Sequence, residues 1–192
     1  MTFAPLPASA TWRHVDAQDG FETVFFRAAA SGYVVDGHTT AIEDAVAWAV
    51  HFTVEVDEQW VTRHCRVRSW SELGERELVL AHDAAGRWRI DGVLAPALDG
   101  CLDVDLEASA CTNMLPVRRA ALPALGSMDA PAVYVRAPDL AVERLEQTYQ
   151  RLAHQDELTF AYRAPRFGFE DELVFAADGL VREYPGIAVR VT

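Results

Sequence analysis

Residues 48–57, Trp-Ala-Val-His-Phe-Thr-Val-Glu-Val-Asp, alternate between large apolar side chains and small or polar ones along their whole length. Because neighbouring side chains on a β-strand point to opposite faces of the sheet, this alternation is typical of a strand with one buried face. Trp48 and Phe52 then share the apolar face, and His51 lies on the polar face. The stretch indicates a fold built from half-buried strands.

Similar patterns recur on both sides of this stretch. They predict further strands within residues 61–68, 77–82, 87–91, 101–107, 131–136, 158–163, 172–176 and 180–184. Asp-Gly pairs favour tight turns because both residues tolerate positive φ, and five such pairs begin at Asp19, Asp36, Asp91, Asp99 and Asp178. We predict more than about 40% strand and less than about 15% helix, against typical values of roughly 20–25% and 30–35%.

Two segments carry helical signals. In residues 140–152, Val142, Leu145 and Tyr149 recur at a spacing close to one helical turn. In residues 112–121, Thr112 or Asn113 can cap a helix that has Pro116 in its first turn. The spacing of apolar residues fits a helix better in the first segment than in the second.

Composition limits the classes of function. The chain has 192 residues, a net charge of −12 and a pI near 4.8, and all its basic residues are arginine. Its size suits a single domain spanning residues 1–192. The acidic balance argues against nucleic acid and against an electrostatic hold on anionic membranes. Residues 1–10 lack the basic and apolar parts of a signal peptide, and no apolar run could span a membrane, so we expect a cytoplasmic protein.

The segment from Asp99 to Glu107 is the densest in acidic side chains. On a strand, Asp99, Asp103, Asp105 and Glu107 would lie on one face and repel one another. Three interpretations stay open: an ion-pair network with Arg118 and Arg119, a polar ligand contact, or a hard-metal site. No histidine has the spacing of a metal-binding pair, and the sequence leads us to assign no metal-ligating residue and no cofactor.

Aromatic side chains offer a second candidate surface. Trp48 and Phe52 share one face of their predicted strand. They would either fill the core or form the wall of an apolar cavity inside a curved sheet. We also expect the neighbours Arg118 and Arg119 to differ in role, one pairing with Asp103 or Asp105 and the other reaching solvent or a partner chain.

The chain resembles a bacterial family called putative glycolipid-binding, formerly a domain of unknown function. The resemblance is carried by residues 98–106, Leu-Asp-Gly-Cys-Leu-Asp-Val-Asp-Leu, and by residues 112–119, Thr-Asn-Met-Leu-Pro-Val-Arg-Arg. Matches to Gly20-Phe21-Glu22, Gln147-x-Tyr149 and Tyr184-Pro185-Gly186 extend it along the chain. The chain departs from the family pattern at Ser109-Ala110, where the pattern has Thr-Pro, and at Met114, where it has Thr.

The resemblance implies a mainly β fold, a spiral β-roll in which a many-stranded, mostly antiparallel sheet wraps around a single α-helix, and a homodimer. It favours residues 112–121 as that helix. It also implies a non-catalytic protein that binds a lipid or glycolipid. Alternatives are an enzyme acting on a small polar or glycosylated substrate through Asp103 or Asp105, and a dimeric interaction protein without a ligand. The candidate binding residues are Asp99, Asp103, Asp105, Asn113, Arg118, Arg119, Trp48 and Phe52.

Overall fold

One long antiparallel sheet dominates the fold. A computed structural model of the protein describes residues 2–16, 18–43, 45–153 and 157–191. The sheet has 14 strands in the order β10-β13-β14-β15-β16-β17-β1-β2-β3-β4-β5-β6-β7-β8. Strands make up 57% of the described residues, which confirms the predicted mainly β class.

The first half of the sheet holds its longest strands. It comprises β1 (Ser9–His14), β2 (Asp19–Ala29), β3 (Gly32–Glu43), β4 (Val46–Val56), β5 (Thr62–Ser71), β6 (Gly74–His82), β7 (Trp88–Ile90) and β8 (Val93–Leu94). The second half comprises β10 (Ser127–Asp129), β13 (Thr148–Arg151), β14 (Leu158–Ala164), β15 (Phe169–Phe175), β16 (Val181–Tyr184) and β17 (Ala188–Val191). β17 pairs with β1, so strands from the two ends of the chain join the halves.

A smaller sheet and one helix lie against the long sheet. The smaller sheet contains β9 (Asp103–Leu106), β11 (Ala132–Val135) and β12 (Val142–Leu145), with β9 parallel to β11. The part of the chain that the structure describes contains three 3-10 turns, η1 (Pro96–Leu98), η2 (Cys111–Asn113) and η3 (Pro165–Phe167). The only α-helix in the described residues is α1 (Met114–Ala120), which continues directly from η2.

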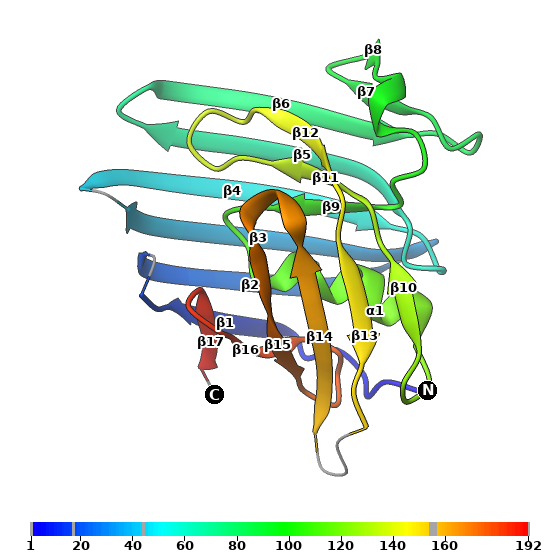
Figure 1. Ribbon diagram of the computed structural model, residues 1–192. Helices are drawn as coiled ribbons and strands as arrows, with labels where there is room; N and C mark the ends of the chain where they lie inside the picture. The colour runs from blue at the N-terminus through cyan, green and yellow to red at the C-terminus, as the bar shows by residue number, and fades with distance from the viewer. Residues whose placement is uncertain (1, 17, 44, 154–156, 192) are drawn as a thin grey trace.

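Helix α1 is enclosed by the sheet. Figure 1 shows α1 between the long strands of the first half and the strands β13, β14 and β15, which cross in front of it. Met114 and Leu115 pack into the core that contains Trp48 and Phe52. Val117 packs into a second core with Tyr149 and the aromatic residues of β14 and β15. The helix therefore contributes to the cores of both halves.

Strand β4 contains the alternating residues 48–56 and has one buried face, as predicted. In β4, every second residue from Trp48 to Val56 is buried, and His51 between them points outward. The helix over residues 112–121 is confirmed by η2 and α1. The other helical candidate, residues 140–152, was wrong, because it forms β12 and β13, which pair with β11 and with β10 and β14. Backbone pairing with other strands prevails there over a local helical spacing.

Two of the five predicted Asp-Gly turns were also wrong. Gly20 lies within β2 and Gly37 lies within β3. A Cβ on Gly37 would meet the Phe52 ring at 2.1 Å, and a Cβ on Gly20 would meet the Thr40 carbonyl oxygen at 1.9 Å. These glycines let the Phe52 ring and the Thr40 carbonyl oxygen lie close to the backbone of a neighbouring strand, where a larger residue would clash.

Candidate functional site

A cavity of about 230 Å³ opens where β9 faces the second half of the sheet. Its polar lining includes Asp105, Glu107, Ser109 and Asn113, and its aromatic lining is Tyr134, Tyr162, Phe167, Phe169 and Tyr184. Larger hollows of about 460 and 380 Å³ lie on the outside of the sheets and are lined mostly by exposed or half-buried residues. The cavity beside β9 is therefore the stronger candidate, since pockets that bind ligands combine aromatic walls with a few convergent polar groups.

Asp105 is the central acidic group of this cavity. It is half-buried on β9, and its strand neighbour on β11 is Tyr134. The pKa of Asp105 is raised to about 7, because burial and the carboxylates of Asp103 and Glu107 raise it more than a hydrogen bond from Thr112 lowers it. Near neutral pH the Asp105 carboxyl therefore exists in both protonation states and can either donate or accept a hydrogen bond.

Glu107 follows β9 directly and is held by two donors. The Tyr134 hydroxyl donates to one oxygen of Glu107 at 2.7 Å, and the Ala137 backbone N–H donates to the other at 2.7 Å. Burial and the nearby Glu107 carboxylate raise the pKa of Tyr134, so its hydroxyl stays protonated. The Glu107 carboxyl thus has a fixed orientation at the cavity.

Two amide side chains orient tyrosines in the same region. The Tyr149 hydroxyl donates to Asn113 Oδ1 at 2.8 Å, and the Tyr162 hydroxyl donates to Gln147 Oε1 at 2.8 Å. Asn113 and Gln147 are both buried. Asn113 also lines the cavity, where its carbonyl oxygen accepts from Tyr149 and its amide nitrogen donates to the Ala110 carbonyl oxygen at 3.4 Å.

The loop that leads into α1 is fastened by a buried carboxyl group. Glu22 on β2 accepts hydrogen bonds from the Ser109 hydroxyl, from the Ala110 N–H at 2.9 Å and from the Cys111 N–H at 3.3 Å. Burial raises the pKa of Glu22 to about 7 against these three hydrogen bonds. Ser109 keeps the hydroxyl of the family's threonine, and Ala110 supplies an N–H donor that a proline would lack.

The arginines after β9 differ in role, as predicted. Arg119 pairs with Asp103, with its Nη2 at 2.5 Å and its Nε at 3.3 Å from the two carboxylate oxygens. Arg118 lies half-buried over the Trp60 ring at 4.4 Å and donates to the Asp178 carbonyl oxygen. Arg118 is thus held by contacts within the chain, and the expectation that the second arginine reaches solvent was wrong.

The structure separates the predicted site residues into distinct places. Asp105 and Asn113 line the cavity, whereas Asp103, Arg118 and Arg119 make the contacts described above. Asp99 lies in an exposed turn before β9, where its carbonyl oxygen accepts from Arg144 at 2.7 Å. Trp48 and Phe52 lie in the core of the first half and are not part of the cavity lining.

Sequence reasoning missed the aromatic side of the cavity. Tyr134, Tyr162 and Tyr184 come from β11, β14 and β16, so only the strand pairing brings them together. Their spacing along the chain has no common period. The nearest signal in the sequence was the family match at Gln147-x-Tyr149, whose two side chains orient Tyr162 and Asn113.

A long antiparallel sheet wound around one helix, with an acidic and aromatic cavity beside that helix, defines a β-roll with an internal polar pocket. The chain belongs to the family described as putative glycolipid-binding, whose sequence pattern matches residues 9–190. This confirms the resemblance found in the sequence. No protein with a curated description matches the chain.

Two solved structures are similar to this one. The crystal structure of a DUF1089 family protein from Pseudomonas aeruginosa has a TM-score of 0.77 and 26% identity, covering 100% of this chain and 97% of that one. The crystal structure of a beta-barrel-like protein of domain of unknown function DUF1849 from Brucella abortus has a TM-score of 0.52 and 14% identity, covering 98% and 96%. The second likeness shows the fold alone.

None of the helices in the described part of the chain is both long and apolar enough to cross a membrane.

Proposed function

We propose that the protein binds a glycolipid, with the sugar head group in the cavity beside β9. The observation that carries this proposal is the lining, which combines Asp105, Glu107 and Asn113 with several aromatic rings. A sugar presents hydroxyl groups, which bond well to carboxylates and amides, and C–H faces, which pack on aromatic rings. The family description supports the same class of ligand.

The size of the cavity limits what enters it. Its volume of about 230 Å³ is below the roughly 300–1,000 Å³ of pockets for drug-sized ligands, so it suits one small polar group rather than a whole glycolipid. Phe167, which is 51% exposed and contacts Tyr134, stands at the rim. An acyl chain would then run outward past Phe167 and leave the cavity to the head group.

Calorimetric titration with octyl glycosides that differ in the sugar, below their micellar concentrations, tests this proposal. Octanol and the free sugars are the matched probes for the chain and the head group. We expect saturable binding of at least one glycoside and at least tenfold weaker binding of octanol. Asp105→Asn keeps the shape but removes the charge, and should weaken binding about 10–100-fold, as expected for a hydrogen bond to a charged group.

The exposed Asp99 provides the control, since Asp99→Asn removes the same charge outside the cavity. Equal affinity for octanol and the glycosides, or equal affinity of the Asp105→Asn variant and the wild type, would contradict the proposal.

A second candidate function is favoured by the pKa of Asp105. A carboxyl with a pKa of about 7 in a cavity can act as a general acid at neutral pH, and Glu107 is a second carboxyl in the same lining. This would be an enzyme acting on a glycosylated substrate. Release of free sugar from the bound glycoside, followed by mass spectrometry and abolished in Asp105→Asn, would support catalysis over simple binding.

We also propose that the chain forms a homodimer, which the family resemblance motivates. Native mass spectrometry of protein purified without detergent measures the number of chains and any retained lipid together. A spectrum containing only the monomer at micromolar concentration would contradict the dimer.

A further inference from the structure

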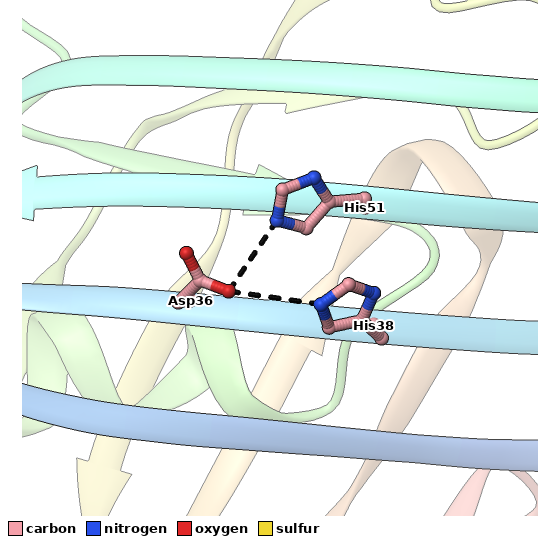
Figure 2. A group of neighbouring side chains, drawn as sticks. All are labelled: Asp36, His38 and His51. Carbon is pink, nitrogen blue, oxygen red and sulfur yellow. Dashed lines mark hydrogen bonds and ion pairs between the residues drawn. The ribbon is translucent and has the colours of Figure 1, made fainter.

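Three side chains that can bind metals gather on the outer surface of the long sheet, away from the cavity. Asp36 and His38 are two residues apart on β3, and His51 on β4 is the direct strand partner of His38. All three therefore project from the same face. Figure 2 shows the Asp36 carboxylate turned toward both imidazole rings.

The distances in this cluster are close to those of a metal site. Asp36 Oδ1 lies 3.3 Å from His51 Nε2 and 3.7 Å from His38 Nε2, and the three ligand atoms lie within 4.8 Å of one another. Around a tetrahedral Zn²⁺, ligand atoms at about 2.0–2.2 Å from the metal lie about 3.3–3.6 Å apart. Small side-chain adjustments would therefore bring the three atoms around one ion.

The two imidazole rings are already arranged side by side. Their centroids are 4.4 Å apart and their planes differ by 13°. Because the rings are nearly parallel and both Nε2 atoms lie near Asp36 Oδ1, both nitrogens are directed to the same side of the cluster. Paired strands hold the two rings beside each other. Because the lone pair of each Nε2 lies in its ring plane, the rings would rotate out of this stacked arrangement to coordinate one ion.

The second oxygen of Asp36 is held by other groups. Thr53 Oγ1 donates to Asp36 Oδ2 at 3.2 Å, and Arg27 Nη2 lies 3.5 Å from the same oxygen. These contacts leave Oδ1 directed at the two histidines. Hydrogen bonds of this kind orient the ligating groups of metal sites and tune their affinity.

We propose that Asp36, His38 and His51 form a binding site for a divalent transition metal such as Zn²⁺ or Cu²⁺. Two imidazole nitrogens and one carboxylate oxygen suit these ions better than Mg²⁺ or Ca²⁺, which prefer oxygen ligands. The side chain of His38 is 59% exposed and that of His51 33% exposed, so the remaining coordination position faces solvent. Water or a group from another molecule completes the site there.

The sequence alone gave no sign of this site, because His38 and His51 are separated by thirteen positions. They become neighbours through the register of β3 and β4. The site is independent of the cavity and of any lipid ligand.

The test is calorimetric titration of the full-length chain, free of any affinity tag, with ZnCl₂. We expect one Zn²⁺ bound per chain with micromolar affinity, and at least tenfold weaker binding in each of His38→Asn and His51→Asn. His64→Asn is the matched control, since His64 is a half-buried histidine on the neighbouring strand β5 and outside the cluster. Thr53→Val should weaken binding by up to about tenfold through the orientation of Asp36.

Electron paramagnetic resonance of the Cu²⁺ complex gives a second readout. Hyperfine splitting from two nitrogens is expected in the wild type and from one nitrogen in each single histidine variant. Far-ultraviolet circular dichroism checks that the variants keep the fold. The proposal is overturned if the folded wild type binds no Zn²⁺ saturably below about 100 µM, or if His64→Asn weakens binding as much as His38→Asn and His51→Asn do.

Discussion

Asp103 and Asp105 stand two residues apart on β9, yet their surroundings differ sharply. Asp103 is completely buried and paired with Arg119, whereas Asp105 lines a cavity and has no arginine partner in the described residues. Burial raises the pKa of both carboxyls, but only at Asp103 does a guanidinium counteract it. One carboxyl is therefore committed to an ion pair and the other is available for a ligand.

The difference arises from what lies opposite each end of β9. Helix α1 places Arg119 at the Asp103 end, and the tyrosines of β14 and β16 face the Asp105 end. Tyrosines can donate hydrogen bonds to a carboxylate but cannot neutralise it. The acidic segment is thus divided between an ion pair and a binding cavity, although the sequence presents it as one run.

The largest expected change in stability concerns the Asp103 end of β9, where Asp103 pairs with Arg119. Arg119→Ala leaves the fully buried Asp103 without its counter-charge and should lower the free energy of unfolding by about 3–5 kcal/mol. Arg118→Ala loses a cation–π contact with Trp60 and should cost about 1–2 kcal/mol. Urea denaturation of both variants measures the difference. Equal losses below 1 kcal/mol would contradict the role of Arg119 as the counter-charge of the buried Asp103.

A smaller change, which increases stability instead of lowering it, is expected at the Asp105 end of β9 beside the cavity. The folded-state pKa of Asp105, about 7, is above the value of 3.8 that is usual for an aspartate side chain, so the folded state favours the protonated form. The resulting stability is present below about pH 4 and is lost as the pH rises toward 7. Asp105→Asn should therefore stabilise the protein at pH 8, by about 2 kcal/mol, while weakening glycoside binding.

Urea denaturation from pH 5 to pH 8 checks this prediction. The variant should show a smaller decrease in stability across that range than the wild type. Asp99→Asn serves again as the control, because Asp99 is exposed. A destabilised Asp105→Asn variant at pH 8 would mean that Asp105 contributes to the fold as Asp103 does.

The sequence predicted the fold well because its evidence is local. Alternation in residues 48–57 reports which side of a strand is buried, and that depends only on neighbouring residues. The wrapped helix was identified through the family resemblance, since the apolar spacing of residues 140–152 alone favoured the wrong segment. Local patterns do not reveal which strands pair.

The candidate site was predicted only in part for the same reason. Asp105 was found from the run of acidic residues on one strand, and Asn113 lies in the family motif. Tyr162 and Tyr184 reach the cavity only through the register of β14 and β16, and Glu22 reaches Ser109 only because β2 passes beneath the loop before α1. Contacts between distant segments require the topology, which the sequence pattern does not contain.

The smallest expected effect concerns Ala110, where the family pattern has proline. Ala110 has a φ of −68°, which suits proline, so Ala110→Pro should gain about 0.4–1 kcal/mol by restricting the unfolded chain. It also removes the N–H that donates to Glu22 at 2.9 Å, a loss of about 1.5–3 kcal/mol when the acceptor is charged.

The balance between these two effects at Ala110 should depend on pH. The pKa of Glu22 is about 7, so at pH 5 its carboxyl is protonated and needs the N–H less, and Ala110→Pro should be neutral or slightly stabilising. At pH 8 Glu22 is ionised, and the same change should destabilise by about 1 kcal/mol. Combining it with Glu22→Gln, whose amide stays neutral, should abolish the pH dependence of the effect. A change of stability that is the same at both pH values in the single variant would show that the Ala110 N–H does not support the Glu22 carboxylate.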